Sequence, residues 1–276
     1  MTDGEIEQPQ VSVVVVAWRA RDDVIRCLES LQAGADLSYE AIVIDDGSCD
    51  GTAEAVRARF PAHTVVAKQH NEGLVAGRNT ALALVRGRYV AMLDADTMLC
   101  AGALRILVDE LEREPRVGLV APKLVYPDGR LQLSCRRYPP LLLPFLRRGP
   151  YARLNPEPAA HRRHLMMDED HIRARPVVWV AGAAHVYRAD LPSRIGDYDP
   201  RISSYGGEDL DWCLRVWHAG LEVRYLPRAR VVHVWQEVTR RKPYGRRSLR
   251  QLLDWFYLQW KHRAMRFDPG LEEAKA

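Results

Sequence analysis

The sequence predicts an α/β fold with a mostly parallel sheet that is flanked by helices on both faces. Val11–Ala17 and Ala41–Ile44 are apolar runs too short for helices, and the first is rich in β-branched residues, which is typical of strands buried on both faces of a parallel sheet. Between them, Val24, Leu28 and Leu31 recur at helical spacing. Strands that alternate with helices in this way indicate βαβ units.

The same alternation continues along the chain. We expect a helix over Thr52–Phe60, a strand over His63–Ala67, a helix over Leu74–Val85 and a strand over Tyr89–Leu93. The pattern then changes, because residues 136–176 hold many prolines, arginines and histidines without periodicity. A stretch of this kind between ordered segments predicts a long functional excursion, which we expect on the acceptor side of a site.

Order resumes after the excursion. The expected elements are an ordered segment at Val177–Ala181, a helix over Glu208–Ala219, apolar segments at Val223–Leu226 and Arg230–Val234, and a final helix over Arg246–Arg266.

Composition narrows the class of protein. The 276 residues are 47% hydrophobic and 28% charged, and the net charge of +4 is too mild to indicate nucleic-acid binding. The charge is unevenly distributed: basic residues gather in 136–175 and 240–266, and acidic ones at 45–50, 94–96 and 208–211. This asymmetry suits an acidic metal pocket bordered by a basic surface for phosphates or an anionic membrane.

The five cysteines are odd in number and none is paired at CxxC spacing, so neither a disulfide framework nor a zinc site is indicated. Residues Met1–Gln10 are polar and acidic, unlike a signal peptide, and we expect them to be disordered. No apolar run approaches the roughly 20 residues of a membrane-spanning helix. These features predict a cytoplasmic protein.

Polar signals follow three of the expected strands. They are Trp18-Arg19, Asp45-Asp46-Gly47-Ser48 and Asp94-Ala95-Asp96. Any one of them could be an ordinary turn, and for the second that alternative has about even odds. Because ligands of open α/β sheets bind beyond the carboxyl ends of the strands, all three together favour a site at that edge.

The pair Asp94 and Asp96 carries the sharpest chemical signal. Residues two apart in an extended chain point the same way, so both carboxylates can face one cavity. Two like charges that close are costly without a cation beside them. Mg²⁺ or Mn²⁺, with diphosphate oxygens as further ligands, is the natural occupant.

The segment Asn71–Asn79 joins a strand to a helix and contains glycines and Arg78. Backbone donors and an arginine at a helix start would suit a diphosphate. The alternative is a plain glycine turn with a surface arginine, and in isolation that alternative is favoured.

Two glycines, Gly206 and Gly207, precede three acids at the start of the next predicted helix: Glu208, Asp209 and Asp211. Helical spacing gives this helix a core face of Leu210, Cys213, Leu214 and Trp217. We therefore expect that Asp209 and Asp211 are not both buried in that core. The acids could merely complement the helix dipole, or the glycines could bring a carboxylate to a substrate. His233 lies in a strand-like segment, where a lone histidine is usually a core residue.

Together these segments resemble the family-two glycosyltransferases of the GT-A fold, especially the rhamnosyltransferase-like branch. Seven segments occur in the order of that family: Val11–Trp18, Ile44–Ser48, Asn71–Asn79, Leu93–Asp96, Val180–Ala183, Gly207–Arg215 and Val231–Trp235. The resemblance covers most of the chain. It departs at Arg19, where the family usually has asparagine.

The resemblance implies a nucleotide-diphosphate sugar donor, UDP or dTDP, and Mn²⁺ or Mg²⁺. Asp46 would meet the base, in a pocket lined by Ala17 and Trp18. Arg78 would lie near the base or diphosphate, with Gly73 and Ala95 also at the donor. Asp94 would approach the ribose or the metal, while Asp96 and His233 would bind the metal.

On the catalytic side, the resemblance implies that Asp209 is the general base that deprotonates the acceptor hydroxyl. Glu208 and Asp211 would support Asp209 or contact the acceptor, and the anomeric centre would be inverted by direct displacement. The acceptor stays open: a glycan, a lipid-linked glycan, a peptide or a natural product. We expect a nucleotide-sugar-binding half over 11–121, an acceptor-binding and catalytic half over 122–240 and a helical appendage over 241–276.

The final helix predicts a further contact. One face carries Leu249, Leu252, Leu253, Phe256 and Trp260, and around it lie Arg246, Arg247, Arg250, Lys261, Arg263 and Arg266. This pattern fits peripheral attachment to the inner face of a membrane. Packing on the protein's own core or in a homodimer is the favoured alternative, about two to one.

Two other functions compete with glycosyl transfer. A nucleotidyltransferase would share the sheet and the metal carboxylates, but no glycine-rich, lysine-containing phosphate loop lies near the N-terminus. An inactive nucleotide-sugar-binding module would lack an acid at position 96 or 209, and both acids are present.

Overall fold

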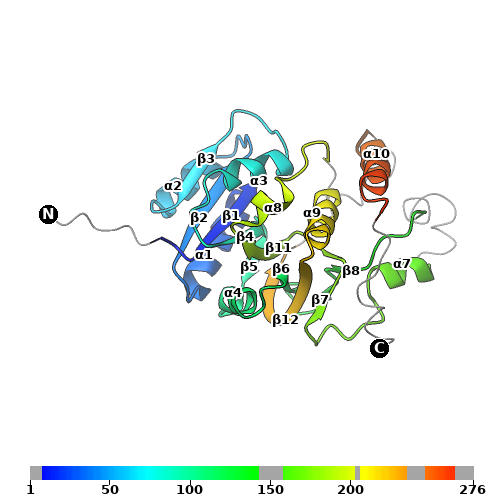
Figure 1. Ribbon diagram of the computed structural model, residues 1–276. Helices are drawn as coiled ribbons and strands as arrows, with labels where there is room; N and C mark the ends of the chain where they lie inside the picture. Colours follow the sequence, from blue (N-terminus) through cyan, green and yellow to red (C-terminus); the bar gives the residue numbers. More distant parts are fainter. Residues whose placement is uncertain (1–7, 143–157, 203–205, 235–245, 265–276) are drawn as a thin grey trace.

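The computed structural model of the protein describes residues 8–142, 158–202, 206–234 and 246–264, and side chains in the last range from 250 onward (Figure 1). The strands are β1 (Val11–Ala17), β2 (Tyr39–Asp45), β3 (Thr64–Ala67), β4 (Tyr89–Asp94), β5 (Thr97–Leu99), β6 (Val117–Val125), β7 (Leu131–Gln132), β8 (Cys135–Arg136), β9 (Arg175–Pro176), β10 (Trp179–Val180), β11 (Ala184–Arg188) and β12 (Glu222–His233). The helices are α1 (Arg21–Gly34), α2 (Thr52–Arg59), α3 (Leu74–Leu82), α4 (Ala103–Arg113), α7 (Ala159–His164), α8 (Leu191–Ile195), α9 (Gly207–His218) and α10 (Arg246–Lys261).

One large sheet organises the described part of the molecule. Its strands lie in the order β3-β2-β1-β4-β11-β6-β12-β5, with β7 beside β6 and β9 beside β12. The pairs β1–β2, β2–β3, β1–β4 and β6–β12 are parallel, whereas β11 runs antiparallel to β4 and β6, and β5 antiparallel to β12. The predicted mostly parallel α/β sheet is confirmed.

The strand register gathers the polar segments at one edge. In β1, Val16 lies opposite Asp94 of β4 and Ala17 lies opposite Asp45 of β2. β11 begins at this edge, because Ala184 pairs with Leu93 and the Asp94 amide donates to the carbonyl of Ala183 at 2.8 Å. The ends of β1, β2 and β4 and the start of β11 therefore meet.

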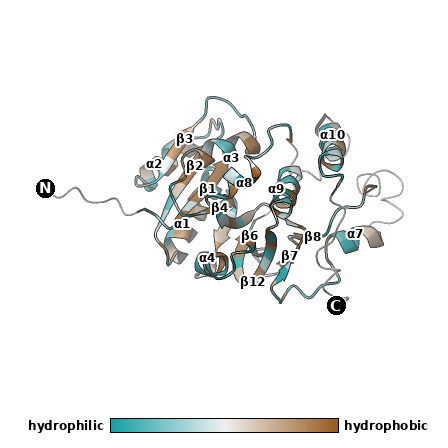
Figure 2. Ribbon diagram, in the orientation of Figure 1, coloured by the Kyte–Doolittle hydropathy of each residue, from teal (hydrophilic) through white to brown (hydrophobic). Residues whose placement is uncertain are grey.

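Both faces of the sheet are covered, as the apolar runs predict. Val13 and Val15 of β1 belong to the core beneath α1 and α4, and Val14 belongs to the core beneath α3 and α9. Figure 2 shows the resulting contrast between apolar inner strands and the polar outer surfaces of helices. Because alternate residues of β1 enter different cores, the strand is apolar except for Ser12 and does not alternate between apolar and polar residues.

Several boundaries differ from the expectations. The apolar segments at Val223–Leu226 and Arg230–Val234 belong to the single strand β12, whose pairing with β6 shifts register between Leu226 and Arg230. An irregularity of this kind hides a continuous strand from periodicity. α3 ends at Leu82 rather than Val85.

The excursion over 136–176 is described in part. It holds α7 and β9, β8 ends at its first residue, and residues 143–157 lie outside the described residues, as do residues 1–7 of the expected disordered N-terminus. α10 follows α9 in space at the edge of the molecule away from β3 (Figure 1). Among the described helices, none combines the length and apolar character needed to cross a bilayer.

Candidate active site

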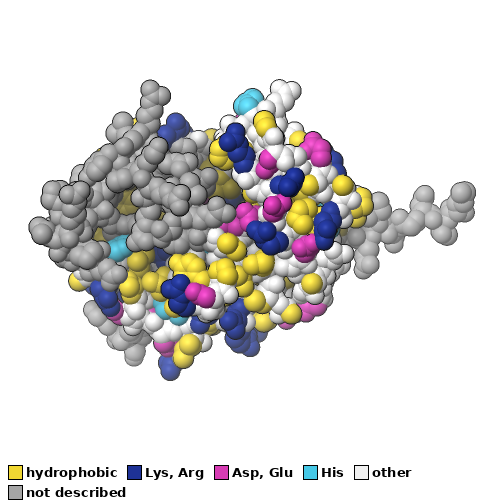
Figure 3. Space-filling view, turned by 180° about the vertical axis from the view of Figure 1, so that it is seen from behind, with side chains coloured by type: hydrophobic (Ala, Val, Ile, Leu, Met, Phe, Trp, Pro, Cys, Tyr) yellow, Lys and Arg dark blue, Asp and Glu magenta, His cyan; other side chains and the backbone are white. Residues whose placement is uncertain are grey.

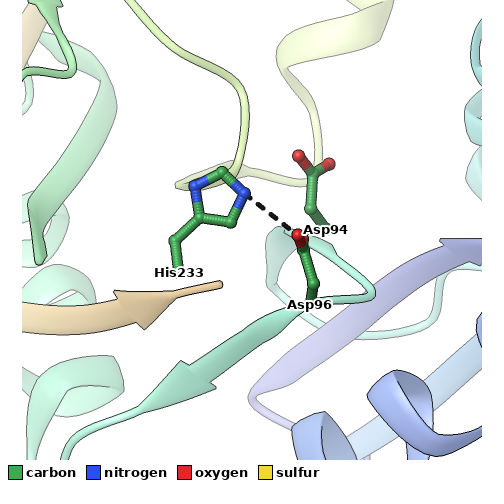
Figure 4. Close-up of side chains that lie close together, drawn as sticks. All are labelled: Asp94, Asp96 and His233. Atoms are coloured by element: carbon green, nitrogen blue, oxygen red, sulfur yellow. Dashed lines mark ion pairs between the residues drawn. The ribbon is translucent and has the colours of Figure 1, made fainter. Parts of the chain in front are cut away.

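Three side chains converge at the carboxyl edge of the sheet. Asp94 ends β4, Asp96 lies in the turn before β5, and His233 ends β12 (Figure 4). One ligand atom from each lies within 4.8 Å of the others, and His233 Nε2 is 3.2 Å from Asp96 Oδ1. The β5–β12 ladder creates this proximity, since His233 pairs with Thr97 and the amide of Val234 donates to the carbonyl of Asp96 at 3.0 Å.

The negative charge of the two aspartates in this cluster is only partly compensated by the side chains around them. Burial raises the pKa of Asp94 to about 6, with Arg78 and His233 opposing the shift and Asp96 adding to it. Burial disfavours the charged form of His233, but the hydrogen bond and negative charge of Asp96 outweigh it and raise the pKa of His233. Two carboxylates held this close favour an added positive charge.

Gln132 of β7 orients the histidine. Its Oε1 accepts a hydrogen bond of 2.7 Å from Nδ1 of His233, and both side chains are buried. With the Nδ1 proton donated to Gln132, Nε2 is the ring nitrogen that faces Asp96, and it can bind a cation once it is deprotonated. This arrangement of amide oxygen, imidazole and free Nε2 is the one found behind metal-binding histidines. The two carboxylate oxygens and one imidazole nitrogen therefore fit a divalent cation with positions left open for a ligand.

The expectation that Asp209 and Asp211 are not both buried is wrong. Glu208, Asp209 and Asp211 all lie below the surface in the first turns of α9, beside the buried core residues Leu210, Cys213 and Leu214. Helical spacing correctly placed Leu210, Cys213 and Leu214 in the core, but Trp217 is only partly buried, and Trp212 and Val216 are buried as well. This spacing could not show that charged partners from other elements cover the polar face.

Asp209 is held by two donors. Its Oδ1 accepts from Nη1 of Arg78 at 2.9 Å, and its Oδ2 accepts from the amide of Gly182 at 2.8 Å. A Cβ atom on Gly182 would lie 2.0 Å from Asp209 Oδ1, so only glycine allows this approach. In both contacts a carboxyl oxygen of Asp209 is the acceptor.

Arg78 connects the two acidic groups of the site. Besides Asp209, its guanidinium lies 3.7 Å from Asp94 and 3.9 Å from Glu208, and it covers the ring of Tyr198 at 5.2 Å. Burial alone would lower the pKa of Arg78, but Asp209 and the other partners outweigh burial, and the pKa is raised. A fixed positive charge therefore lies between the metal candidates and α9. Arg78 is buried. The alternative interpretation of Asn71–Asn79, a plain glycine turn with an arginine on the surface, is therefore wrong for Arg78.

Glu208 differs from Asp209 although it is the next residue. Burial raises its pKa well above the usual value, the neighbouring Asp209 adds to the shift, and Arg78 only partly opposes it. Its Oε2 has no hydrogen-bond partner within the described part of the chain. The environment favours the protonated acid.

Asp211 points away from this group and into the contact with α10. It accepts from Arg215 at 2.9 Å, from Lys261 at 2.6 Å and from His262 at 2.8 Å. The three acids of the motif are therefore divided between two places. The structure brings Glu208 and Asp209 to Arg78, and Asp211 to a helix–helix contact.

At the donor end, Asp46 holds the segment before α3. Its carboxylate accepts from the amides of Glu72 at 3.1 Å and Gly73 at 2.7 Å, and Lys68 Nζ lies 3.6 Å away. Ala17 is buried at the end of β1, whereas Trp18 is 48% exposed. Ala95 lies between the two metal candidates and packs against the core. The structure places these positions along one edge.

Sequence reasoning missed Gln132 and Tyr198, and it gave Gly182 no individual role. Gln132 lies in a two-residue strand without periodicity, so no local signal indicated it. Tyr198 stacks on Trp212 with ring centroids 3.9 Å apart, and Asn79 bonds its backbone amide and carbonyl. Gly182 belongs to the segment Val180–Ala183, which contributed to the family resemblance but gave no physical reason for a glycine at this position.

The chain was compared with protein families and known proteins. Residues 12–164 match the model of glycosyl transferase family 2. The chain is 26% identical over 263 residues to N-acetylglucosaminyl-diphospho-decaprenol L-rhamnosyltransferase of Mycobacterium tuberculosis, which covers 91% of this chain and 84% of that protein. It is 30% identical over 231 residues to the pre-mycofactocin glycosyltransferase of the same organism, covering 81% of this chain and 42% of that protein.

Solved structures share the fold. GalNAc-T7 with UDP, GalNAc and Mn²⁺ superposes with a TM-score of 0.68 at 17% identity, over 92% of this chain and 50% of that one. A mannosyltransferase from Pyrobaculum calidifontis with GDP-Man and Mn²⁺ gives 0.61 at 20% identity, over 96% and 67%. These likenesses show that the protein has the GT-A fold. The family model and the curated relatives favour a glycosyltransferase over a nucleotidyltransferase. With the family model matching more than half of its length, the chain belongs to glycosyl transferase family 2.

Proposed function

We propose that this protein is an inverting, metal-assisted glycosyltransferase that uses a UDP- or dTDP-sugar. The convergence of Asp94, Asp96 and His233 at the carboxyl edge of the sheet carries the proposal. Support comes from solved structures of the same fold, which hold Mn²⁺ together with UDP or GDP-Man.

In this proposal, Asp96, Asp94 and His233 hold Mn²⁺ or Mg²⁺ next to the donor diphosphate. When bound, the ion neutralises charge that grows on the leaving diphosphate. The donor base lies toward Asp46, Ala17 and Trp18, and Gly73 and Ala95 border the same edge. Asp46 supports this pocket by fixing the backbone of residues 72 and 73.

Asp209 is proposed as the general base. The acceptor hydroxyl oxygen attacks the anomeric carbon while its proton passes to the Asp209 carboxylate, and the bond to the diphosphate oxygen breaks with its electron pair leaving on that oxygen. Direct displacement inverts the anomeric centre. Arg78 and the Gly182 amide fix the carboxylate in one position, and such positioning is a recognised source of rate enhancement.

The other two acids take different roles in the proposal. Glu208, as a buried protonated acid beside Arg78, supports Asp209 and limits the negative charge around the base. Asp211 fixes α10 instead of contacting the acceptor, because its two oxygens already bond to Arg215, Lys261 and His262.

The acceptor class can be ordered for testing. The rhamnosyltransferase that matches 91% of this chain is named for a sugar carried on diphospho-decaprenol. A lipid-linked glycan is therefore the first acceptor to test, before a free glycan, a peptide or a natural product.

Calorimetry with a panel of nucleotide sugars tests the proposal. We expect UDP- or dTDP-sugars to bind only with Mn²⁺ or Mg²⁺, and Asp96→Ala to abolish the metal-dependent part of the affinity. Asp128→Ala is a matched control, because Asp128 is a surface aspartate bonded only to Arg130 among the described contacts. Equal donor affinity with and without Mn²⁺ in the unmodified protein would rule out the metal assignment.

A further inference from the structure

The outer face of α10 has an unusual polarity. Leu253, Phe256 and Trp260 are 60%, 50% and 62% exposed and follow one another at helical spacing. A helix at the surface of a globular domain normally turns such residues inward. By helical spacing they share one face with Leu249 and Leu252. Leu252 is only partly exposed, and the side chain of Leu249 lies outside the described residues.

The inner face of α10 is attached mainly by charged and polar groups. Lys261 bonds Asp199 at 2.8 Å, Tyr257 donates to the same carboxylate at 2.7 Å, and His262, just after the helix, bonds Asp211 at 2.8 Å. Leu258 is the deeply buried apolar residue of this contact. The apolar face named from the sequence therefore does not pack on the protein's own core: α10 is attached through its other side, and Leu253, Phe256 and Trp260 are exposed.

Charge identifies the kind of surface that would cover the apolar face. Exposed Arg250 lies one turn before Leu253, and exposed Arg263 places its guanidinium 5.3 Å from the ring centroid of Trp260. The single acid among the described side chains of α10, Asp254, is buried. On the face of the molecule seen in Figure 3, basic and acidic side chains are interspersed among the described residues.

A second apolar segment lies beside α10. Leu141 and Leu142 are both more than half exposed, and the carbonyl of Leu141 accepts from Nε1 of Trp255 at 3.2 Å. Trp255 is partly buried and packs against the cluster around Leu258, so this contact is not on the exposed apolar face. The α10 surface is therefore defined by the helix and the turn just after it, as Arg250, Leu253, Phe256, Trp260 and Arg263.

We propose that the α10 surface docks the protein on the surface of an anionic lipid membrane. Leu253 and the two aromatic rings enter the boundary between headgroups and acyl chains, and the two arginines contact the headgroup phosphates. A second copy of the chain fits less well, because a symmetric contact would bring arginines of like charge together. The inference does not depend on the sugar, the metal or the base.

Flotation of the full chain with vesicles tests the proposal. We expect binding to equal parts of phosphatidylglycerol and phosphatidylcholine at low salt, weaker binding at high salt, and little binding to phosphatidylcholine alone. Phe256→Ser combined with Trp260→Ser should lower the partition coefficient about tenfold or more. Leu84→Ser is the matched control, since Leu84 is an exposed leucine after α3, remote in sequence from this surface.

Thermal unfolding and donor calorimetry on the same variants show whether they are folded; Leu253→Ser provides a second, milder change. No flotation of the unmodified protein, flotation of the double variant like the unmodified protein, or equal binding to phosphatidylcholine would overturn the proposal. A dimer in sedimentation equilibrium that the double variant disrupts would assign the face to a second copy instead. Failure here with intact metal-dependent donor binding would leave the proposed function standing.

Discussion

Two acidic groups border α9, and they differ in how their charge is compensated. Toward the sheet edge, Asp94 and Glu208 have raised pKa values because burial outweighs the charge of Arg78. Toward α10, Asp199 and Asp211 have lowered pKa values, because hydrogen bonds from Arg201, Lys261 and His262 outweigh their burial. In the first group Arg78 does not fully compensate the negative charge of the acids, whereas in the second group the acids already have enough cationic partners.

This difference separates candidate ligand sites from structural contacts. A cation or a substrate proton can be accommodated at the sheet edge, where it relieves repulsion between buried acids. At the α10 contact, a further cation would compete with lysine, arginine and histidine. The sequence motif Glu208-Asp209-Leu210-Asp211 spans both groups, so adjacent acids in one motif serve different purposes.

The largest expected effect distinguishes Asp209 from its neighbour. Asp209→Asn keeps the shape of the side chain but cannot accept the acceptor proton, so single-turnover transfer should fall by roughly 10²–10⁴. Donor affinity by calorimetry should stay nearly unchanged. Glu208→Gln is the matched control and should cost less, because the acid it replaces is already favoured in its neutral form. A larger loss in Glu208→Gln would transfer the role of base to Glu208.

A smaller effect should follow from changing the partner of His233. Gln132→Leu removes the acceptor for the Nδ1 proton, and the histidine loses its fixed orientation. The affinity for Mn²⁺, measured by calorimetry in the absence of donor, should fall about 10- to 100-fold. Gln132→Glu retains an acceptor oxygen and should retain most of the affinity. Unchanged affinity in Gln132→Leu would show that Gln132 does not position the ligand.

Stability should respond in opposite ways in the two groups. Asp211→Asn weakens the bonds to Lys261, His262 and Arg215, and should lower the free energy of unfolding by about 1–3 kcal/mol. Glu208→Gln removes a buried acid whose ionised form is disfavoured, so it should leave stability unchanged or raise it. Denaturant unfolding at neutral pH compares them. A loss in Glu208→Gln equal to that of Asp211→Asn would contradict the distinction.

The smallest expected effect is a change in the slope of stability against pH. Asp199 and Asp211 have folded pKa values below the unfolded value of about 3.9. Their stabilisation is therefore present above that value and is lost as the pH falls through their folded pKa values. Glu208, with a raised pKa, contributes with the opposite sign and favours the folded state as the pH falls. In Asp211→Asn, the free energy of unfolding should therefore fall less steeply as the pH is lowered. Chemical unfolding measured below about pH 4 shows this difference, whereas measurements between pH 5 and neutrality do not.

Local sequence pattern was enough to predict the sheet and to place the candidate site at the carboxyl edge of its strands. Apart from Ser12, Val11–Ala17 is apolar because alternate side chains enter two cores, and that pattern is local. Asp94 and Asp96 were recognisable because residues two apart in an extended chain share a direction. Their convergence with His233 followed from the family resemblance, not from local pattern.

Only the tertiary structure decided which acids have partners. Arg78 is 131 residues from Asp209, and Gln132 is 101 residues from His233, so no periodicity connects them. The same holds for α10: its composition indicated an amphipathic helix, but which side faces the protein depends on Asp199 and Asp211, which lie elsewhere in the chain. Local pattern reports the burial of apolar side chains, whereas the burial of a charge depends on partners that folding brings from a distance.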